Sequence, residues 1–126
     1  MSAYLLDTNV AVRLLLGDRN GVPGRVAATL ENTEHQVSLS VASVWEIAIK
    51  RSLGRLAIDR AWFPALLQLG FEVMPVTALH AAEVERLPWH HRDPFDRLLI
   101  AQARVERRTL VTADRRLAAY DVPVLW

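Results

Sequence analysis

Four carboxylates are the side chains of this sequence best suited to chemistry: those of Asp7, Glu46, Asp96 and Asp114. Carboxylate oxygens are ligands that Mg2+ and Mn2+ prefer in proteins. An ion held by such oxygens can activate water, and a second ion can stabilise the leaving oxygen in an in-line displacement at a phosphodiester. If the fold brings the four together, they predict metal-assisted hydrolysis.

The elements that must position these acids can be inferred from the pattern of apolar residues. Short apolar runs predict strands at 3–6, 36–39, 71–75, 109–111 and 122–125. Apolar residues recur at helical spacing over 10–16, 26–30, 41–49, 62–69, 79–87 and 95–105. The segment 113–120 predicts a short helical turn, and the glycines and polar residues of 17–21 predict a turn. Strands that alternate with helices indicate βαβ units and a parallel sheet.

All four acids are expected at one edge of that sheet. Asp7 ends the first strand, and Asp114 follows the fourth strand, behind Thr112. Glu46 lies in the first two turns of the helix after the second strand, and Asp96 lies in the first turn of its helix. Ligand sites of parallel sheets lie beyond the carboxyl ends of the strands. We therefore expect the carboxylates to converge there.

Such a convergence is unfavourable without a cation. Two carboxylates about 4 Å apart repel each other by roughly 4 kcal/mol at an effective dielectric constant near 20. Four of them would either raise one another's pKa values or bind a metal ion.

Each acid also has a simpler explanation. Asp7 could cap the first helix, and Glu46 could be a solvated helix residue, although its neighbours are apolar. Asp96 could be the acidic partner in a capping box, and Asp114 could be a turn residue. A shared edge of the sheet explains all four at once, which favours the metal site.

Composition limits the class of protein. The 126 residues fit a single domain over 1–126 and include no cysteine, so disulfides and thiolate metal ligands are excluded. Fifteen basic residues balance fourteen acidic ones, so net charge indicates no partner. We see neither a signal peptide nor a membrane span in the sequence and expect a cytoplasmic protein.

Four segments resemble the signature segments of PIN-domain proteins, and more narrowly those of VapC toxins from type II toxin–antitoxin systems. They are YLLDTN at 4–9, SVWEI at 43–47, DPFDRLLIAQA at 93–103 and LVTAD at 110–114. The resemblance spans nearly the whole chain. It implies a PIN-like three-layer α/β/α fold with a parallel sheet of about five strands, often as a homodimer.

The resemblance also implies an activity and partners: an Mg2+- or Mn2+-dependent endoribonuclease toxin that is held inactive by a VapB-type antitoxin. It places Asp7, Glu46, Asp96 and Asp114 at the family's metal-binding, catalytic positions. Residues flanking them are expected to support the ligands, namely Thr8, Asn9 and Thr112. Arginines adjoining the acidic segments are expected to contact RNA phosphates: Arg92, Arg97, Arg115 and Arg116.

Other interpretations remain open. A receiver-like phosphoacceptor would need an acidic pair after the first strand, where Thr8 stands, and a lysine near a later strand end, whereas the only lysine is Lys50. A degenerate PIN module could merely bind RNA or a protein, and DNA is not excluded as substrate. No zinc motif surrounds His90 and His91, which favours a structural or substrate-orienting role. His80 is expected at the surface.

A partner site is a further possibility. A mixed apolar and basic region could receive an antitoxin helix, although plain core packing explains the same residues. Its apolar members are Val44, Trp45, Trp62, Phe63, Leu66 and Leu67.

Overall fold

A computed structural model describes residues 2–18 and 21–126 of the chain. Its centre is a five-stranded sheet in the order β3-β2-β1-β4-β5, in which every neighbouring pair is parallel. The strands are β1 (Ala3–Leu6), β2 (Gln36–Ser40), β3 (Glu72–Met74), β4 (Thr109–Val111) and β5 (Val124–Leu125). The predicted parallel sheet of about five strands is therefore confirmed.

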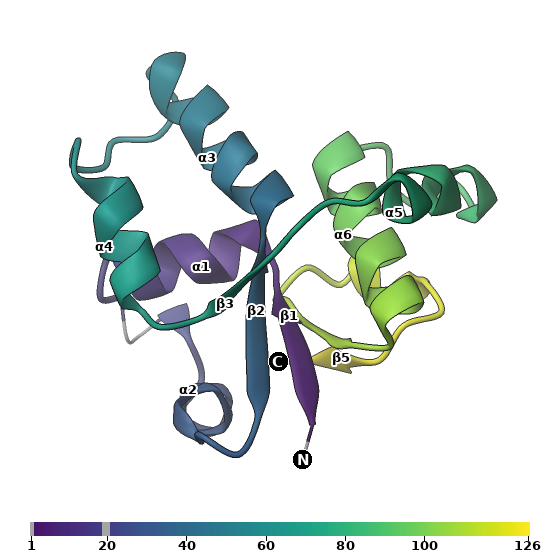
Figure 1. The fold of residues 1–126 in the computed structure, drawn as a ribbon, viewed down its shortest axis with the longest axis horizontal. Helices are drawn as coiled ribbons and strands as arrows, with labels where there is room; N and C mark the ends of the chain where they lie inside the picture. The colour runs from purple at the N-terminus through teal and green to yellow at the C-terminus, as the bar shows by residue number, and fades with distance from the viewer. Residues whose placement is uncertain (1, 19–20) are drawn as a thin grey trace.

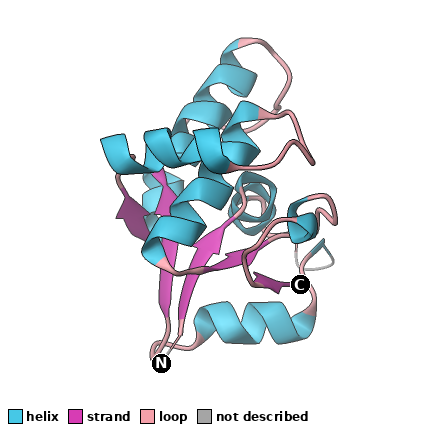
Figure 2. Cartoon of the chain, turned by 90° about the vertical axis from the view of Figure 1, so that its right-hand side faces the viewer, coloured by secondary structure: helices cyan, strands magenta, loops and turns pink. Residues whose placement is uncertain are grey.

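Helices cover both faces of this sheet. Figure 1 shows α1, α2 and α4 on one side and α5 and α6 on the other, while α3 rises from the end of β2. Figure 2 gives the view from the α5–α6 side, with helices in front of the strands. The helices are α1 (Thr8–Leu15), α2 (Gly24–Glu31), α3 (Val41–Ser52), α4 (Trp62–Gln68), α5 (Ala78–Glu83) and α6 (Pro94–Glu106).

Two hydrophobic cores lie on the two faces of the sheet. On the first face, Leu6 packs with residues of α1, α2 and α3, including Val10, Val26 and Ile47. On the second face, Leu5 packs with α6 through Leu99 and other residues. Alternate side chains of β1 thus point to opposite cores, as expected for a strand buried on both sides.

The register of the strands determines what meets at the edge of the sheet. Leu6 of β1 lies opposite Val111 of β4, so Asp7 and Thr112 follow at the same level. The Asp7 N–H continues the ladder by donating to the Val111 carbonyl at 2.9 Å. On the other side of β1, Ser40 ends β2 and caps α3 by accepting from the Ala42 N–H.

The structure differs from the sequence prediction at three places. The helix expected over 79–87 ends at Glu83 and continues as a short 3-10 helix, η2 (Val84–Arg86). The helical turn expected over 113–120 reduces to the 3-10 helix η3 (Leu117–Ala119). His80, expected at the surface, is buried, because its ring closes a capping box with Thr77 and donates to Glu106.

Two further expectations concern loops and membranes. The turn expected around 17–21 includes residues 19 and 20, which lie outside the described residues. Among the residues described, no helix is both long and apolar enough to cross a membrane.

Candidate metal centre

Asp7 is a buried carboxylate whose charge is poorly compensated. Asp7 is 3% exposed and occupies the N-cap position of α1, yet its side chain makes no capping hydrogen bond. Instead, Oδ2 accepts a 2.7 Å hydrogen bond from the Thr112 hydroxyl. Burial raises the pKa of Asp7 and the charge of Glu46 adds to this, whereas Thr112 and the N–H groups of Thr8 and Asn9 oppose it.

Glu46 points from the first two turns of α3 into the protein, 5% exposed. Its Oε2 pairs with Lys50 Nζ at 2.8 Å, one helical turn along. Its Oε1 is buried and has no hydrogen-bond partner among the described residues. A buried carboxylate oxygen without a partner is costly, so a bound cation would fit this atom well.

Asp96 lies in the first turn of α6, after the N-cap residue Asp93, whose side chain accepts from the Asp96 N–H. The Asp96 carboxylate is directed elsewhere: its Oδ2 accepts from His91 Nε2 at 2.7 Å. Burial, followed by the charges of Asp7, Asp93 and Glu46, raises the pKa of Asp96 to about 6, against the effect of His91. Three of the four sequence-predicted acids are thus close enough to influence one another.

Asp114 lies beside Asp96 but is paired with an arginine. Its Oδ2 accepts from Arg116 Nη2 at 2.8 Å, and this pairing lowers the pKa of Asp114. Its backbone N–H donates to the Thr112 hydroxyl, the same group that holds Asp7. One ligand atom each from His91, Asp96 and Asp114 lies within 4.8 Å of the other two.

The geometry therefore divides the four acids into two overlapping groups. Asp96 belongs to both, since it senses the charges of Asp7 and Glu46 and also forms the compact trio with His91 and Asp114. Asp7 and Glu46 are not members of that trio. The four side chains share one edge of the sheet without sharing one 4.8 Å cluster.

The prediction that Arg97 contacts RNA phosphate is contradicted by its position. Arg97 is 3% exposed, and its guanidinium donates to the carbonyls of Val84, Leu87 and Pro88. It also reaches the His91 carbonyl at 3.4 Å and so holds the 84–91 segment against α6. Its donors are used inside the protein, and the sequence gives no signal of this.

The other predicted phosphate contacts lie at the surface. Arg92 and Arg115 are exposed. Arg116 is exposed and bound to Asp114. Their role in binding RNA stays a prediction.

Sequence reasoning missed two partners of the acids. Lys50 stands four residues after Glu46, a spacing at which helical side chains meet, so this pair could have been found. The sequence predicts only a structural or substrate-orienting role for His91, because its bond to Asp96 depends on a loop conformation that apolar periodicity does not reveal. Thr8, expected to support the site, donates to Ser43 at 2.8 Å and ties α1 to α3.

The proposed antitoxin region is partly core and partly surface. Leu66 is buried, and Val44 and Trp62 pack against the first core. Trp45, Phe63 and Leu67 are exposed. A hollow of about 850 Å3 lies elsewhere, between α1, α2 and the segment before β3, and none of the four acids lines it.

Comparison with known proteins agrees with this architecture. The PIN domain family model matches residues 4–123, so the chain belongs to the PIN-domain family. A comparison with curated proteins gives no match.

Solved structures of similar fold come from several bacteria. The chain resembles VapBC2 from Rickettsia felis bound to a DNA fragment from the promoter, with a TM-score of 0.74 and 16% identity over 98% of this chain and 97% of that one. It resembles FitAcB from Neisseria gonorrhoeae with a TM-score of 0.67 and 24% identity over 98% and 96%. A toxin–antitoxin complex from Klebsiella pneumoniae gives a TM-score of 0.64 and 19% identity over 98% and 96%.

Proposed function

We propose that this chain is a metal-dependent endoribonuclease, the toxin component of a VapBC-type toxin–antitoxin system. The observation that carries the proposal is the buried pair Asp7 and Glu46 beside Asp96. Burial and mutual repulsion raise the pKa of Asp7 and of Asp96, and one oxygen of Glu46 has no described partner. A divalent cation would relieve both conditions.

The residues fit such an ion by their chemistry. Asp7 and Asp96 are the main ligands in this proposal, and Glu46 and Asp114 complete the site or hold a second ion. When bound, Mg2+ or Mn2+ would activate water for attack on a phosphodiester bond. The protein's own contribution is to orient the ligands: the Thr112 hydroxyl fixes Asp7, and His91 fixes Asp96.

Phosphate binding is assigned to exposed cations near this edge. Arg92, Arg115 and Arg116 offer planar donors that suit phosphate oxygens. Arg116 would exchange its contact with Asp114 for a phosphate when Asp114 turns to metal.

The deciding experiment compares RNA cleavage by the wild type and Asp7→Asn. The wild type is expected to cleave RNA in Mg2+ or Mn2+ and to lose this cleavage in excess EDTA. The Asp7→Asn variant is expected to fold but not to cleave RNA. Asp121→Asn, at an exposed position, is the matched control and should remain active. Cleavage that persists in EDTA, or an active Asp7→Asn variant, would contradict the proposal. DNA of the same sequence tests the preference for RNA.

A partner is proposed on the same basis. The similar structures from Rickettsia felis and Klebsiella pneumoniae are, by name, VapBC2 and a toxin–antitoxin complex. The exposed side chains of Trp45, Phe63 and Leu67 offer apolar surface for a VapB-type antitoxin. Co-purification with the product of a neighbouring gene, and light scattering for the proposed homodimer, test these assignments.

A second candidate function is a PIN module that binds RNA or a protein without cleaving. It is favoured by the pairing of Glu46 with Lys50 and of Asp114 with Arg116, which neutralises two of the four acids without metal. Calorimetry with Mn2+ separates the two candidates, because the degenerate module would show no metal binding.

A further inference from the structure

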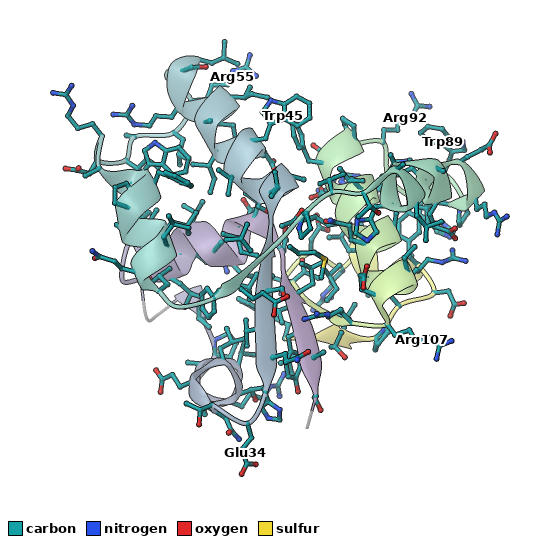
Figure 3. All side chains as sticks on the ribbon, viewed as in Figure 1. Glu34, Trp45, Arg55, Trp89, Arg92 and Arg107 are labelled. Carbon is teal, nitrogen blue, oxygen red and sulfur yellow. The ribbon has the colours of Figure 1, made fainter. Side chains whose placement is uncertain are left out.

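Trp89 is the most exposed of the large apolar side chains described, at 74%. It lies in the loop between η2 and α6, two residues before His91. Figure 3 shows Trp89 next to Arg92 at the upper end of the α5–α6 side, the end of the molecule far from Glu34. Unlike most exposed side chains, this one is also held in a fixed position.

One face of the indole ring is closed by the buried guanidinium of Arg97. The Arg97 Cζ lies 3.8 Å from the ring centroid, a close cation–π contact. Because that guanidinium also donates to carbonyls on both sides of the ring's own loop, those of Leu87 and His91, the backbone that carries Trp89 is clamped. The ring thus presents its other face to solvent from a pre-organised position.

The same clamp connects this ring to the acidic site. Arg97 directly follows Asp96 in α6 and holds the His91 carbonyl, and the His91 ring donates to Asp96. The exposed face of Trp89 and the Asp96 carboxylate are therefore fixed by one small network. The ring and the acidic site are thus joined by consecutive contacts through Arg97 and His91.

The residues around the ring suit a nucleobase and the phosphates beside it. The loop reads Trp-His-His-Arg over 89–92, with His90 and Arg92 exposed. Interfaces between proteins are also enriched in Trp and Arg, and the light-scattering outcome below separates the two kinds of partner. Binding sites for single-stranded nucleic acid combine aromatic rings, on which bases stack, with cations that follow the backbone.

We propose that Trp89 is a stacking platform for one unpaired base of the RNA strand, next to the phosphate bound at the metal centre. This inference rests on the proposed function and deepens it, because it restricts the substrate to RNA that is single-stranded at that base. Arg97 is the positioning residue that fixes the ring, and Arg92 is placed to meet a phosphate of the same strand.

The test measures binding of a short single-stranded RNA by the whole chain, with Ca2+ in place of Mg2+ and with intact RNA verified afterwards on a gel. Trp89→Leu is expected to weaken binding about 5- to 150-fold, the range for losing one stacked base. Trp89→Phe should restore most of the affinity. Leu79→Ala, at an exposed apolar position on α5, is the matched control and should bind like the wild type.

A second arm of the experiment changes the RNA instead of the protein. The same RNA is prepared with one base removed at each position in turn, which leaves the sugar–phosphate chain intact. One abasic position should weaken binding by the wild type as much as Trp89→Leu does, and Trp89→Leu should then have no further effect. Equal affinities of the wild type and Trp89→Leu for the complete RNA would overturn the proposal.

The remaining outcomes separate this proposal from the others. If Trp89→Leu instead changes the mass measured by light scattering and leaves RNA affinity unchanged, the ring belongs to a protein interface and the stacking proposal is wrong. If the wild type cleaves RNA but Trp89 is irrelevant to affinity, only the stacking proposal fails. If the wild type binds no RNA, both proposals fail.

Discussion

At the scale of single residues, folding makes the Asp96 carboxyl harder to ionise. Its pKa rises from 3.8 to about 6, mainly by burial. Well below the unfolded value of 3.8, the carboxyl is protonated in both the folded and the unfolded chain, so it carries no penalty. Between pH 3.8 and about 6 the unfolded chain ionises while the folded chain keeps the proton, so stability falls over this range and the loss is complete above pH 6. A metal ion would remove that penalty.

Asp96→Asn should therefore stabilise the metal-free protein at neutral pH. In EDTA at pH 8, the free energy of unfolding of the variant is expected to exceed that of the wild type by about 1–2 kcal/mol, after allowance for solvent screening. The difference should shrink toward zero near pH 4. Urea denaturation over this range measures it, and a variant less stable than the wild type at pH 8 would contradict this assignment.

At the same scale, the buried Arg97 and the exposed Arg92 are expected to contribute very differently to stability. Arg97→Leu leaves several buried carbonyls of the 84–91 segment without donors and should destabilise the fold by about 3–5 kcal/mol. Arg92→Leu changes an exposed side chain and should alter stability by no more than about 0.5 kcal/mol. Thermal unfolding compares the two, and equal stabilities would refute the clamp.

At the scale of elements, the adjacent ends of β1 and β4 build the centre of the site. Because Leu6 and Val111 are in register, the next residues, Asp7 and Thr112, face each other. The Thr112 hydroxyl donates to Asp7 and accepts from the Asp114 N–H, so one side chain orders two of the acids. The bond to Asp7 follows from strand pairing, and the bond from Asp114 is a local contact in the turn after β4.

Thr112→Val should weaken metal binding without unfolding the protein. Loss of the hydroxyl removes a hydrogen bond that lowers the pKa of Asp7, so its carboxylate becomes harder to ionise at neutral pH. We expect Mn2+ affinity to fall about 10- to 100-fold. Calorimetry at pH 7 measures this, with Thr112→Ser as the control that keeps the hydroxyl. Unchanged affinity in Thr112→Val would argue against Asp7 as a ligand.

The helices were predictable from the sequence where a capping residue directly precedes a segment with helical apolar periodicity. Asp93-Pro94 predicts the start of α6, and Ser40 predicts that of α3, because their side chains cap the helices. Strand ends then place the acids at one edge. The turn of His91 toward Asp96 and the burial of Arg97 were not predictable, because both depend on a loop folding over α6. Both contacts join residues close in the sequence, but they depend on the conformation of the loop, which apolar periodicity does not encode.

At the scale of the whole molecule, α3 and α6 bring the two halves of the site together. They come from different parts of the chain and pack against each other, and each contributes one carboxylate. Trp45 and Phe95, the residues just before Glu46 and Asp96, meet edge to face with ring centroids 5.1 Å apart. The repulsion between the carboxylates acts across the same contact. Metal binding should therefore stabilise the entire fold.

This coupling predicts a metal-dependent melting temperature. A ligand at 100 times its Kd stabilises a protein by about 2.7 kcal/mol, which corresponds to roughly 10 °C for a chain of this size. Mn2+ should raise the melting temperature of the wild type and of Asp121→Asn by this amount, and that of Asp7→Asn hardly at all. An equal rise in Asp7→Asn would mean that the ion binds elsewhere on the molecule. Since only the folded chain assembles residues from β1, α3, α6 and the end of β4, the effect must disappear in the unfolded state, and calorimetric scans at increasing Mn2+ concentration would then show a continuous upward shift.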